Sequence, residues 1–376
     1  MIDPFTGPPD LETGSRLTID LGALQSNWKH LASCAGEAEC AAVVKADAYG
    51  IGIRPAVRAL WQAGARTFFV ALPFEARAVR EELPDAAIYV LGGLAPGSSP
   101  ILAEIKAHPV LGSLPEIDEW ELFAKENGIA GEAAIHVDTG MNRLGLSFAE
   151  TQDVAKRYAG GNLAFRPSLI MSHLACGEDA DHPLTEHQIE SFGNVAADFP
   201  GVPASLANSA GTLQGGAFVF DLCRPGIALY GGHPLGGDNP LKPVVLFDAR
   251  VIQVREVDEG ETVGYGATET ARRPSRVAVV SAGYADGFMR AAGSSDDRRG
   301  ADAIVAGKRC PLIGRVSMDL IAVDVTDLAP DAVRRGDFVT LIGDGITIDE
   351  VGARANTIGY EILTGLGSRF ARIYIG

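Results

Sequence analysis

Residues 41–50 read AAVVKADAYG, an apolar run that ends at once in a lysine followed by small and polar residues. The run at its start is short and partly β-branched, which is typical of a strand buried in a parallel sheet. Similar short runs alternate with longer amphipathic segments as far as residue 230, and this alternation indicates repeated βα units. The eight strands that we predict are Ala41–Val44, Thr67–Ala71, Ala87–Leu91, Pro109–Gly112, Ala133–Asp138, Ser168–Ser172, Ala204–Ala207 and Gly226–Tyr230. Eight such units predict a TIM (β/α)8 barrel, the α/β fold in which parallel strands form a closed inner ring.

A stretch rich in Gly and Pro, Gly231–Pro243, interrupts the helical periodicity and marks a domain boundary. The chain then changes to β-rich runs such as Val244–Val257, although Asp349–Leu363 has the apolar spacing of one helix or two short ones. We therefore predict a barrel over residues 16–240 and a mainly antiparallel β domain over residues 241–376. An open doubly wound sheet is the alternative for the first domain, although no G-x-G-x-x-G turn supports it.

The composition is that of a soluble globular enzyme, with 47% hydrophobic and 21% charged residues in a chain of 376. A net charge of -16 and the lack of any Lys or Arg run argue against a nucleic-acid partner. No apolar run reaches the roughly 20 residues that span a bilayer, and no export signal is visible, so we expect a cytoplasmic protein without a membrane partner. Five irregularly spaced cysteines fit reduced thiols. Residues 1–15 are predicted to be disordered or a remnant of recombinant expression.

Lys45 directly follows the predicted strand Ala41–Val44, which places its amine at the carboxyl end of that strand. In a TIM barrel these ends form the mouth that carries the active site. A lysine there is typical of covalent binding to an aldehyde cofactor or of an anion anchor, with a solvated structural lysine as the plainer interpretation. Tyr49 is placed to reach a bound anion, although core packing explains it equally well. His173 follows Ser168–Ser172 as Lys45 follows its strand, and it is either a stacking partner for an aromatic cofactor or a structural histidine.

Two loops rich in small residues, Asn208–Gly211 and Arg224–Ile227, follow the last two predicted strands. Small residues let backbone N–H groups approach a phosphate, and the loops after strands seven and eight are the usual phosphate site of a TIM barrel. The two loops therefore predict an anion cradle, with ordinary turns as the alternative.

Ten short segments spread along the chain carry a more specific signal. In chain order they read IDLGAL, VVKADAYG, DTGMNRLG, SHLA, ANSAG, RPGIALYG, VGYGAT, SAGYADG, GRVSMD and GYEILTGLGSR. With these segments in this order, the chain resembles the alanine racemase family over essentially its whole length after Arg16. The resemblance implies an isomerase in which a barrel that binds pyridoxal 5'-phosphate (PLP) is joined to a β domain. It also implies a homodimer, paired head to tail, in which each active site takes residues from both protomers.

By the same resemblance, the enzyme interconverts L-alanine and D-alanine and supplies D-alanine for peptidoglycan. Lys45 is then the lysine that binds PLP, and Tyr265 is a second base, contributed to the site of the other protomer. Two bases on opposite faces suit this reaction, because an α-proton must leave one face of the amino acid and return on the other.

The resemblance also implies roles for residues around the two bases. Besides Lys45, the residues that it places at the cofactor are Tyr49, His173, Asn208, Ser209, Arg224, Gly226, Ile227 and Tyr360. Among them, His173 packs beside the pyridine ring and Arg224 meets the pyridine nitrogen. The residues that it places at the substrate or the entrance are Arg143, Met318 through its backbone N–H, Asp319 and Tyr284. No metal ligand is expected.

His136 departs from the family pattern. The family often has a lysine two residues before the Asp of DTGM, modified by carbon dioxide so that it positions the neighbouring arginine. Here that place holds His136, which supplies no negative charge when it is neutral. We therefore expect no carbamylated lysine, and Arg143 must be oriented by a bound anion or by another hydrogen bond.

Three other functions share part of this pattern. A racemase for a larger or more polar amino acid would use the same two bases, since one methylene changes selectivity by only about 1–3 kcal/mol. A non-catalytic PLP carrier would keep the lysine and the phosphate loops, although Tyr265 and the β domain argue against it. A metal-assisted PLP aldolase or dehydratase would need ligands, and the spacing of the available side chains matches no closed zinc site. Those side chains are His173, Cys176, Glu178, Asp181, His182 and His187.

Overall fold

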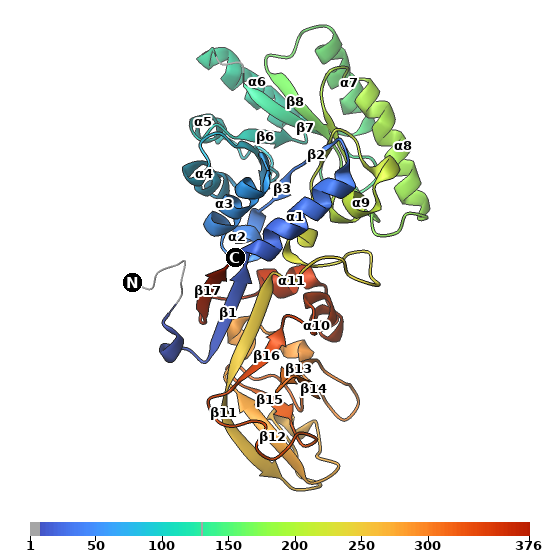
Figure 1. The fold of residues 1–376 in the computed structure, drawn as a ribbon. Coiled ribbons are helices and arrows are strands. Elements are labelled where there is room, and N and C mark those ends of the chain that lie inside the picture. The colour runs from blue at the N-terminus through green and yellow to red at the C-terminus, as the bar shows by residue number, and fades with distance from the viewer. Residues whose placement is uncertain (1–7, 129–130) are drawn as a thin grey trace.

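The computed structural model describes residues 8–128 and 131–376, which fold into a barrel and a β-sheet domain (Figure 1). Seven strands of the barrel pair in chain order, each parallel to the next. They are β3 (Ala42–Val43), β4 (Thr67–Val70), β5 (Ala87–Val90), β6 (His108–Leu111), β7 (Glu132–His136), β8 (Arg166–Met171) and β9 (Ala204–Ser205). Each overlaps a strand predicted from the sequence, so seven of the eight predicted strands are confirmed.

The eighth strand closes the barrel but is not the predicted segment Gly226–Tyr230. The last strand is β10 (Leu222–Cys223), which pairs in parallel with β2 (Glu39–Cys40). On its other side, the backbone N–H of Asp221 donates to the carbonyl oxygen of Ala204 at 3.0 Å. The predicted strand is wrong because its last four residues form a 3-10 helix, with Gly226 at the N-cap. Hydrogen bonds to both neighbours make the ring continuous, and the open-sheet alternative is wrong.

Eight helices of the described chain surround the barrel strands (Figure 1). They are α1 (Leu21–Ala35), α3 (Ile53–Ala63), α4 (Pro73–Glu82), α5 (Ser99–Glu104), α6 (Leu114–Asn127), α7 (Phe148–Ala159), α8 (Pro183–Ala197) and α9 (Ser209–Gln214). Their apolar residues recur at helical spacing; in α3, for example, Ile53, Val57 and Leu60 are all buried. In residues 8–128 and 131–376, no helix combines the length and the hydropathy needed to cross a bilayer.

The second domain is built on one eight-stranded sheet. Its main path runs through β14 (Lys308–Pro311), β13 (Asp302–Val305), β16 (Phe338–Ile342), β11 (Val245–Val257), β1 (Ser15–Asp20) and β17 (Ala371–Ile375). The long strand β11 also pairs with β12 (Ser275–Val280), which pairs in turn with β15 (Ile321–Asp324). All of these pairings are antiparallel except that of β1 with β17. The mainly antiparallel β domain predicted from the sequence is therefore confirmed.

Strand β1 lies in this second sheet, although the sequence assigned residues 16–20 to the barrel. It is antiparallel to β11 on one side and parallel to β17 on the other. Its side chains alternate between buried and half-buried, with Leu17 and Ile19 fully buried. This alternation with a period of two is typical of a strand in a sheet with one covered face. From β1 the described chain therefore passes from the second domain to the barrel and later returns.

Part of the predicted disordered segment is ordered. Residues 1–7 lie outside the described residues, but Asp10–Glu12 form a 3-10 helix. The carboxylate of Asp10 pairs with Arg16 at 3.2 Å and with Arg250 of β11 at 3.1 Å. These contacts attach the segment before β1 to the second domain.

Two short helices near the carboxyl end bring the second domain to the barrel mouth. The helical spacing of Asp349–Leu363 is confirmed by α10 (Ile348–Arg354) and α11 (Gly359–Thr364), and α11 contacts α2 (Lys45–Tyr49) of the barrel. In β17, Arg372 Nη1 donates to the carbonyl oxygen of Gly50 at 2.9 Å. The hydroxyl of Tyr374 donates to the carbonyl oxygen of Ile51 at 2.8 Å. The second sheet is thus attached to the loop that follows Lys45.

We expect Leu17→Ala to lower the free energy of unfolding by about 2–5 kcal/mol, because it leaves a cavity beside a fully buried position of β1. Leu11→Ala is the matched control, since Leu11 is 92% exposed and its loss should change stability by less than about 0.5 kcal/mol. Denaturant unfolding of both variants measures the difference. Equal stability of the two variants would contradict the central place of β1 in the sheet.

Candidate active site

Lys45 lies at the carboxyl end of β3, where the sequence placed it. The backbone N–H of Val44 still donates to Phe69 of β4, and the chain leaves the sheet at the next residue. Burial, together with the nearby guanidinium of Arg143, lowers the pKa of Lys45, while the carboxylate of Glu75 opposes the shift. A lowered pKa raises the fraction of neutral amine, which is the form that acts as a nucleophile or base.

An unusual left-handed turn follows Lys45. The four residues Ala46–Tyr49 have φ between 54° and 55°, a region that costs a non-glycine residue about 1–2 kcal/mol each. The buried carboxylate of Glu75 accepts hydrogen bonds from the N–H groups of Ala46 at 2.6 Å, Ala71 at 2.8 Å and Leu72 at 3.0 Å. This anchor joins the turn to the loop after β4. Glu75 was not predicted as a site residue, because glutamate is common in the first turn of a helix and so carries no functional signal there.

The turn aims Tyr49 at the loop of Gly226. A Cβ atom at Gly226 would lie 2.2 Å from the Tyr49 hydroxyl oxygen, so no larger residue fits there without a shift. The Tyr49 ring stacks on Tyr230 at 4.5 Å between centroids. The buried hydroxyl of Ser209 accepts hydrogen bonds from the N–H groups of Gly226 at 2.8 Å and Ala228 at 3.2 Å. The two loops predicted to form an anion cradle thus lie together and are joined by these hydrogen bonds. Their role in binding an anion stays a prediction.

Tyr360 reaches this cradle from the second domain. Its ring centroid is 6.1 Å from that of Tyr49, and α11 carries it there. Burial raises the pKa of Tyr49 and raises that of Tyr360 to about 12, so both phenols remain protonated hydrogen-bond donors at neutral pH. Ile227 is buried behind the cradle. Asn208 instead caps α9, and its side-chain oxygen accepts from the N–H of Gly211 at 3.1 Å.

Arg224 lies buried beneath the mouth. Its Nη2 donates to the carbonyl oxygen of Ser172 at 2.6 Å, and its Nη1 bonds the hydroxyl of Ser205. Burial lowers the pKa of Arg224 to about 10, which still leaves a cation at pH 7. Among the described residues, the Nε–H of Arg224 has no acceptor, so one charged donor remains available to a ligand.

Two histidines near Arg224 are neutral. Burial and the charges of Arg224 and Arg143 lower the pKa of His136 to about 4 and that of His173 to about 3. His136 ends β7, and His173 follows β8. Neutral imidazoles add no further positive charge, and His136 cannot provide the negative charge of a carbamylated lysine.

Arg143 lies on a loop that Asp138 organises. The Oδ1 atom of Asp138 accepts from the N–H groups of Gly140 and Met141 at 2.9 Å each, and from that of Asn142 at 3.1 Å. Arg143 follows these residues and is exposed at the barrel mouth, and its charge acts on Lys45. The loop therefore presents a cation over the mouth from the end of β7.

Tyr265 projects from the second domain. It is 72% exposed and lies between Gly264, with φ of 80°, and Gly266, with φ of 77°. These left-handed positions suit glycine and set the tight turn that presents the ring. Among the described residues, no hydrogen bond, ion pair or aromatic contact joins Tyr265 to Lys45. The two residues predicted as bases are therefore not brought together within this single chain.

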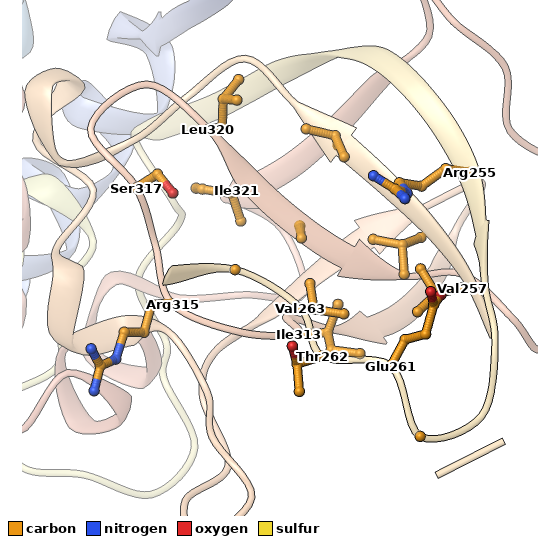
Figure 2. A pocket seen from close by; sticks show the side chains of 15 residues that line it. Arg255, Val257, Glu261, Thr262, Val263, Ile313, Arg315, Ser317, Leu320 and Ile321 are labelled. Carbon is orange, nitrogen blue, oxygen red and sulfur yellow. The ribbon is translucent and has the colours of Figure 1, made fainter. Parts of the chain in front are cut away.

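A cavity of about 540 Å³ lies beside this turn. Gly264 lines it, Val263 and Ile313 contribute apolar surface, and Arg255 and Arg315 lie at opposite ends (Figure 2). All of its lining residues belong to the second domain. It is therefore separate from the cradle at the barrel mouth.

The other residues predicted at the substrate follow Tyr265 in the chain and lie together in the second domain. The N–H of Tyr284 donates to Ser317, and the carbonyl oxygen of Met318 accepts from the N–H of Ala285, each at 3.0 Å. Asp319 forms an ion pair with Arg369 at 2.7 Å. Tyr284, Met318 and Asp319 are each between 42% and 53% exposed, so they form an accessible surface rather than a closed pocket.

Both domains match one protein family. The family model described as "Alanine racemase, N-terminal domain" matches residues 19–234, and "Alanine racemase, C-terminal domain" matches residues 244–374. The chain belongs to the alanine racemase family. The family resemblance and the fold predicted from the sequence are thereby confirmed.

Individual alanine racemases are similar over nearly the whole chain. The alanine racemase of Methylobacterium sp. (strain 4-46) is 54% identical over 96% of this chain and 98% of its own. The crystal structure of alanine racemase from Bartonella henselae, with covalently bound pyridoxal phosphate, has a TM-score of 0.90 and 41% identity, covering 98% of this chain and all of its own. The biosynthetic alanine racemase from Pseudomonas aeruginosa has a TM-score of 0.88 and 38% identity, covering 97% and 100%.

The donor set at the barrel mouth fits PLP. The partly desolvated amine of Lys45 suits the aldehyde of the cofactor. The space that a Cβ at Gly226 would fill suits the phosphate, and the buried donor of Arg224 suits the pyridine ring. In residues 8–128 and 131–376, no three His, Cys, Asp or Glu side chains lie close enough to hold a metal ion. The side chains suggested for a metal-assisted enzyme are therefore not assembled into such a group.

We expect the two neutral histidines to make the fold acid-sensitive between about pH 6.5 and pH 4. The folded-state pKa values lie below the ordinary value of 6.5, so the unfolded chain binds protons in this range and the folded chain does not. Stability is fully present above pH 6.5 and falls as the pH falls. His136→Gln should flatten the curve of unfolding midpoint against pH, whereas His30→Gln, at an exposed position of α1, should leave its slope unchanged. Identical curves for the two variants would refute the assignment.

Proposed function

We propose that this chain is an alanine racemase that interconverts L-alanine and D-alanine with PLP and the two bases Lys45 and Tyr265. The observation that carries the proposal is the amine of Lys45, held with a lowered pKa at a strand end next to an anion cradle. Membership of the family supports the reaction, and a close relative in structure carries covalently bound pyridoxal phosphate. Resolving the enantiomers formed from L-alanine by the purified protein with PLP tests the activity directly.

The cofactor residues divide by what they hold. Lys45 would form the covalent bond to PLP, and His173 would pack beside its ring. The buried cation Arg224 would meet the pyridine nitrogen; because a guanidinium does not release a proton at ordinary pH, that nitrogen would stay unprotonated. The residues that hold the phosphate or its loops are Tyr49, Asn208, Ser209, Gly226, Ile227 and Tyr360.

Bound PLP withdraws electrons from the α-carbon of the substrate, and the protein supplies orientation and proton transfer. The Nζ atom of Lys45 removes the α-proton of D-alanine, or returns a proton to the same face to form D-alanine. The phenolic oxygen of Tyr265 acts on the opposite face, where it removes the α-proton of L-alanine or returns a proton to form L-alanine. Each base in one direction is the acid in the other, because the reaction is reversible.

The substrate carboxylate is bound from both domains. Arg143 supplies a cation from the loop after β7, and Met318 supplies its backbone N–H from the second domain. Tyr284 and Asp319 border the entrance, where Arg369 holds the carboxylate of Asp319. A second protomer would supply Tyr265 to the site of Lys45, since no hydrogen bond or aromatic contact joins the two among the described residues. We therefore propose a homodimer with shared sites, and the 72% exposure of Tyr265 supports it.

We place this reaction in the cytoplasm, where D-alanine would supply peptidoglycan synthesis. The alternative substrate is another amino acid, which an enantiomer-specific assay across the common amino acids distinguishes. A carrier without catalysis would show no exchange of the α-hydrogen of alanine in deuterated water.

Lys45→Ala should abolish covalent binding of PLP, because it removes the amine that we assign to the bond with the cofactor. After incubation with PLP and borohydride, mass spectrometry should find the added cofactor in the unmutated protein and in Lys156→Ala, an exposed lysine of α7, but not in Lys45→Ala. Racemisation should be lost with it. Retention of the bound mass in Lys45→Ala would show that another lysine holds the cofactor.

Mixing two inactive variants tests the shared site. Lys45→Ala and Tyr265→Ala should each lose most activity, by roughly 10²–10⁴-fold for a general acid–base group. A random mixture should recover about a quarter of full activity, since half of the dimers are mixed and one of their two sites is intact. The recovery is measured after dissociating and reassociating the two proteins together. If the mixture stays as inactive as its components, both bases belong to one chain.

A further inference from the structure

Gln188 lies on α8, outside the ring of strands, and its side chain is fully buried. It is neither a cofactor nor a substrate residue of the proposed site. Its amide nevertheless uses both ends: Oε1 accepts from the N–H of Ala175 at 2.8 Å, and Nε2 donates to the carbonyl oxygen of His173 at 2.9 Å. The same Nε2 donates to the hydroxyl of Thr139 at 3.2 Å.

These bonds join two neighbouring loops at the barrel mouth. Thr139 belongs to the loop after β7, which carries Arg143, whereas His173 and Ala175 belong to the loop after β8. The strands end before these residues, so β-ladder bonds no longer set their spacing. The buried amide of Gln188 joins the two loops there instead.

The network continues from Thr139 to the buried cation. The hydroxyl of Thr139 is 2.8 Å from that of Ser172, and the carbonyl oxygen of Ser172 accepts from Arg224 at 2.6 Å. Thr139 and Ser172 are 7% and 1% exposed, so water does not compete for these bonds. A continuous path therefore leads from the loop of Arg143 to the residue facing the cofactor ring.

Thr139 also stands directly beside the residue that shapes its loop. Asp138 binds the three N–H groups that follow Thr139, which makes the segment from Asp138 to Asn142 a compact unit. Because its own hydrogen bonds make this segment rigid, we expect it to move as one body. The Thr139 hydroxyl attaches the segment to Gln188 and Ser172, and Arg143 directly follows the segment in the chain.

We propose that Gln188 and Thr139 are positioning residues that fix the height and direction of Arg143 over the cofactor pocket, and so set the affinity for the substrate carboxylate. This inference rests on the proposed racemase function. It also answers what orients Arg143 here: His136 cannot act as a charged support, and a neutral hydrogen-bond bridge from α8 holds the loop instead.

The expected effect on KM and kcat depends on the stage of the reaction at which Arg143 binds the substrate carboxylate. Arg143 holds the carboxylate both before and during proton transfer, so a misplaced Arg143 weakens substrate and transition state together. Such a loss raises KM and leaves kcat nearly unchanged. A residue that served only global stability would change the unfolding midpoint without this split.

The test compares Thr139→Val, which removes the hydroxyl at nearly constant volume, with Thr151→Val. Thr151 is a fully buried threonine of α7 whose hydroxyl donates to the carbonyl oxygen of Ser147 at 2.8 Å. We expect Thr139→Val to raise KM for both enantiomers of alanine about tenfold, with kcat within about threefold of the unmutated enzyme. Thr139→Ser should restore KM, and Thr151→Val should leave it unchanged.

A second variant and a second measurement keep the outcome clear. Gln188→Glu keeps the volume but loses the donor amide, and it should raise KM like Thr139→Val. Hydrogen exchange of the amides of Gly140, Met141 and Asn142 should quicken in Thr139→Val and Gln188→Glu but not in Thr151→Val.

An unchanged KM in folded Thr139→Val, or an equal rise in Thr151→Val, overturns the inference while the racemase function stands. Absence of racemisation by the unmutated protein instead overturns the proposed function. In that case the exchange measurement still decides whether Thr139 and Gln188 fix the loop, and unchanged exchange in both variants would reject it.

Discussion

The backbone N–H groups of Ala41 and Val43 donate to the carbonyl oxygens of Cys223 and Pro225, at 2.9 Å and 3.1 Å. These two hydrogen bonds hold the first strand of the barrel against the last, across more than 180 residues of chain. Because both strands are parallel, closure also brings the segments after them to the same edge. Lys45 and the loop of Gly226 are neighbours for this reason, and the distance between the amine and the cradle is set by strand register rather than by flexible side chains.

Charge at the mouth is distributed to suit an anionic ligand. Arg143 and Arg224 provide positive charge, while burial keeps His136 and His173 neutral. The buried carboxylate of Glu75, which acts on Lys45, is occupied by three backbone N–H groups. Because buried like charges disfavour one another, the proposed binding of a phosphate and a carboxylate would stabilise this arrangement. The same carboxylate accepts a hydrogen bond from Ala46 in the strained left-handed turn after Lys45. Glu75 therefore both stabilises the turn and affects the pKa of Lys45.

The sequence predicted the parts of the fold that follow from local periodicity. Seven barrel strands were found because each is a short apolar run between turn residues. The eighth was misplaced because the apolar letters of Ile227–Tyr230 resemble a strand, whereas the backbone of Gly226 bends the chain into a 3-10 helix. The assignment of β1 to the barrel failed for a different reason. The alternation of apolar and polar residues along a strand indicates which face is buried, but it does not indicate which sheet the strand joins.

The candidate site was predicted unevenly for similar reasons. Residues within motifs, such as Lys45 and Arg224, were located at the barrel mouth as expected, and their chemical roles stay predictions. Glu75 and Gln188 were missed, because a buried polar residue in a helix has no distinctive neighbours in sequence. Only three-dimensional contacts reveal that each binds loops from two different strands. Tyr265 was recognised only through its motif, and nothing in the local pattern indicated that it would be so exposed.

Strand β1 has a consequence for how this chain reaches its folded state. It precedes the barrel in the chain, whereas its neighbours β11 and β17 both follow the barrel. Contacts so distant in sequence form slowly, because a large loop must close before they contribute. Until then the edges of β1 remain unpaired and open to association with other chains. The barrel can therefore form before the second sheet, which is complete only when β11 and β17 have both been synthesised.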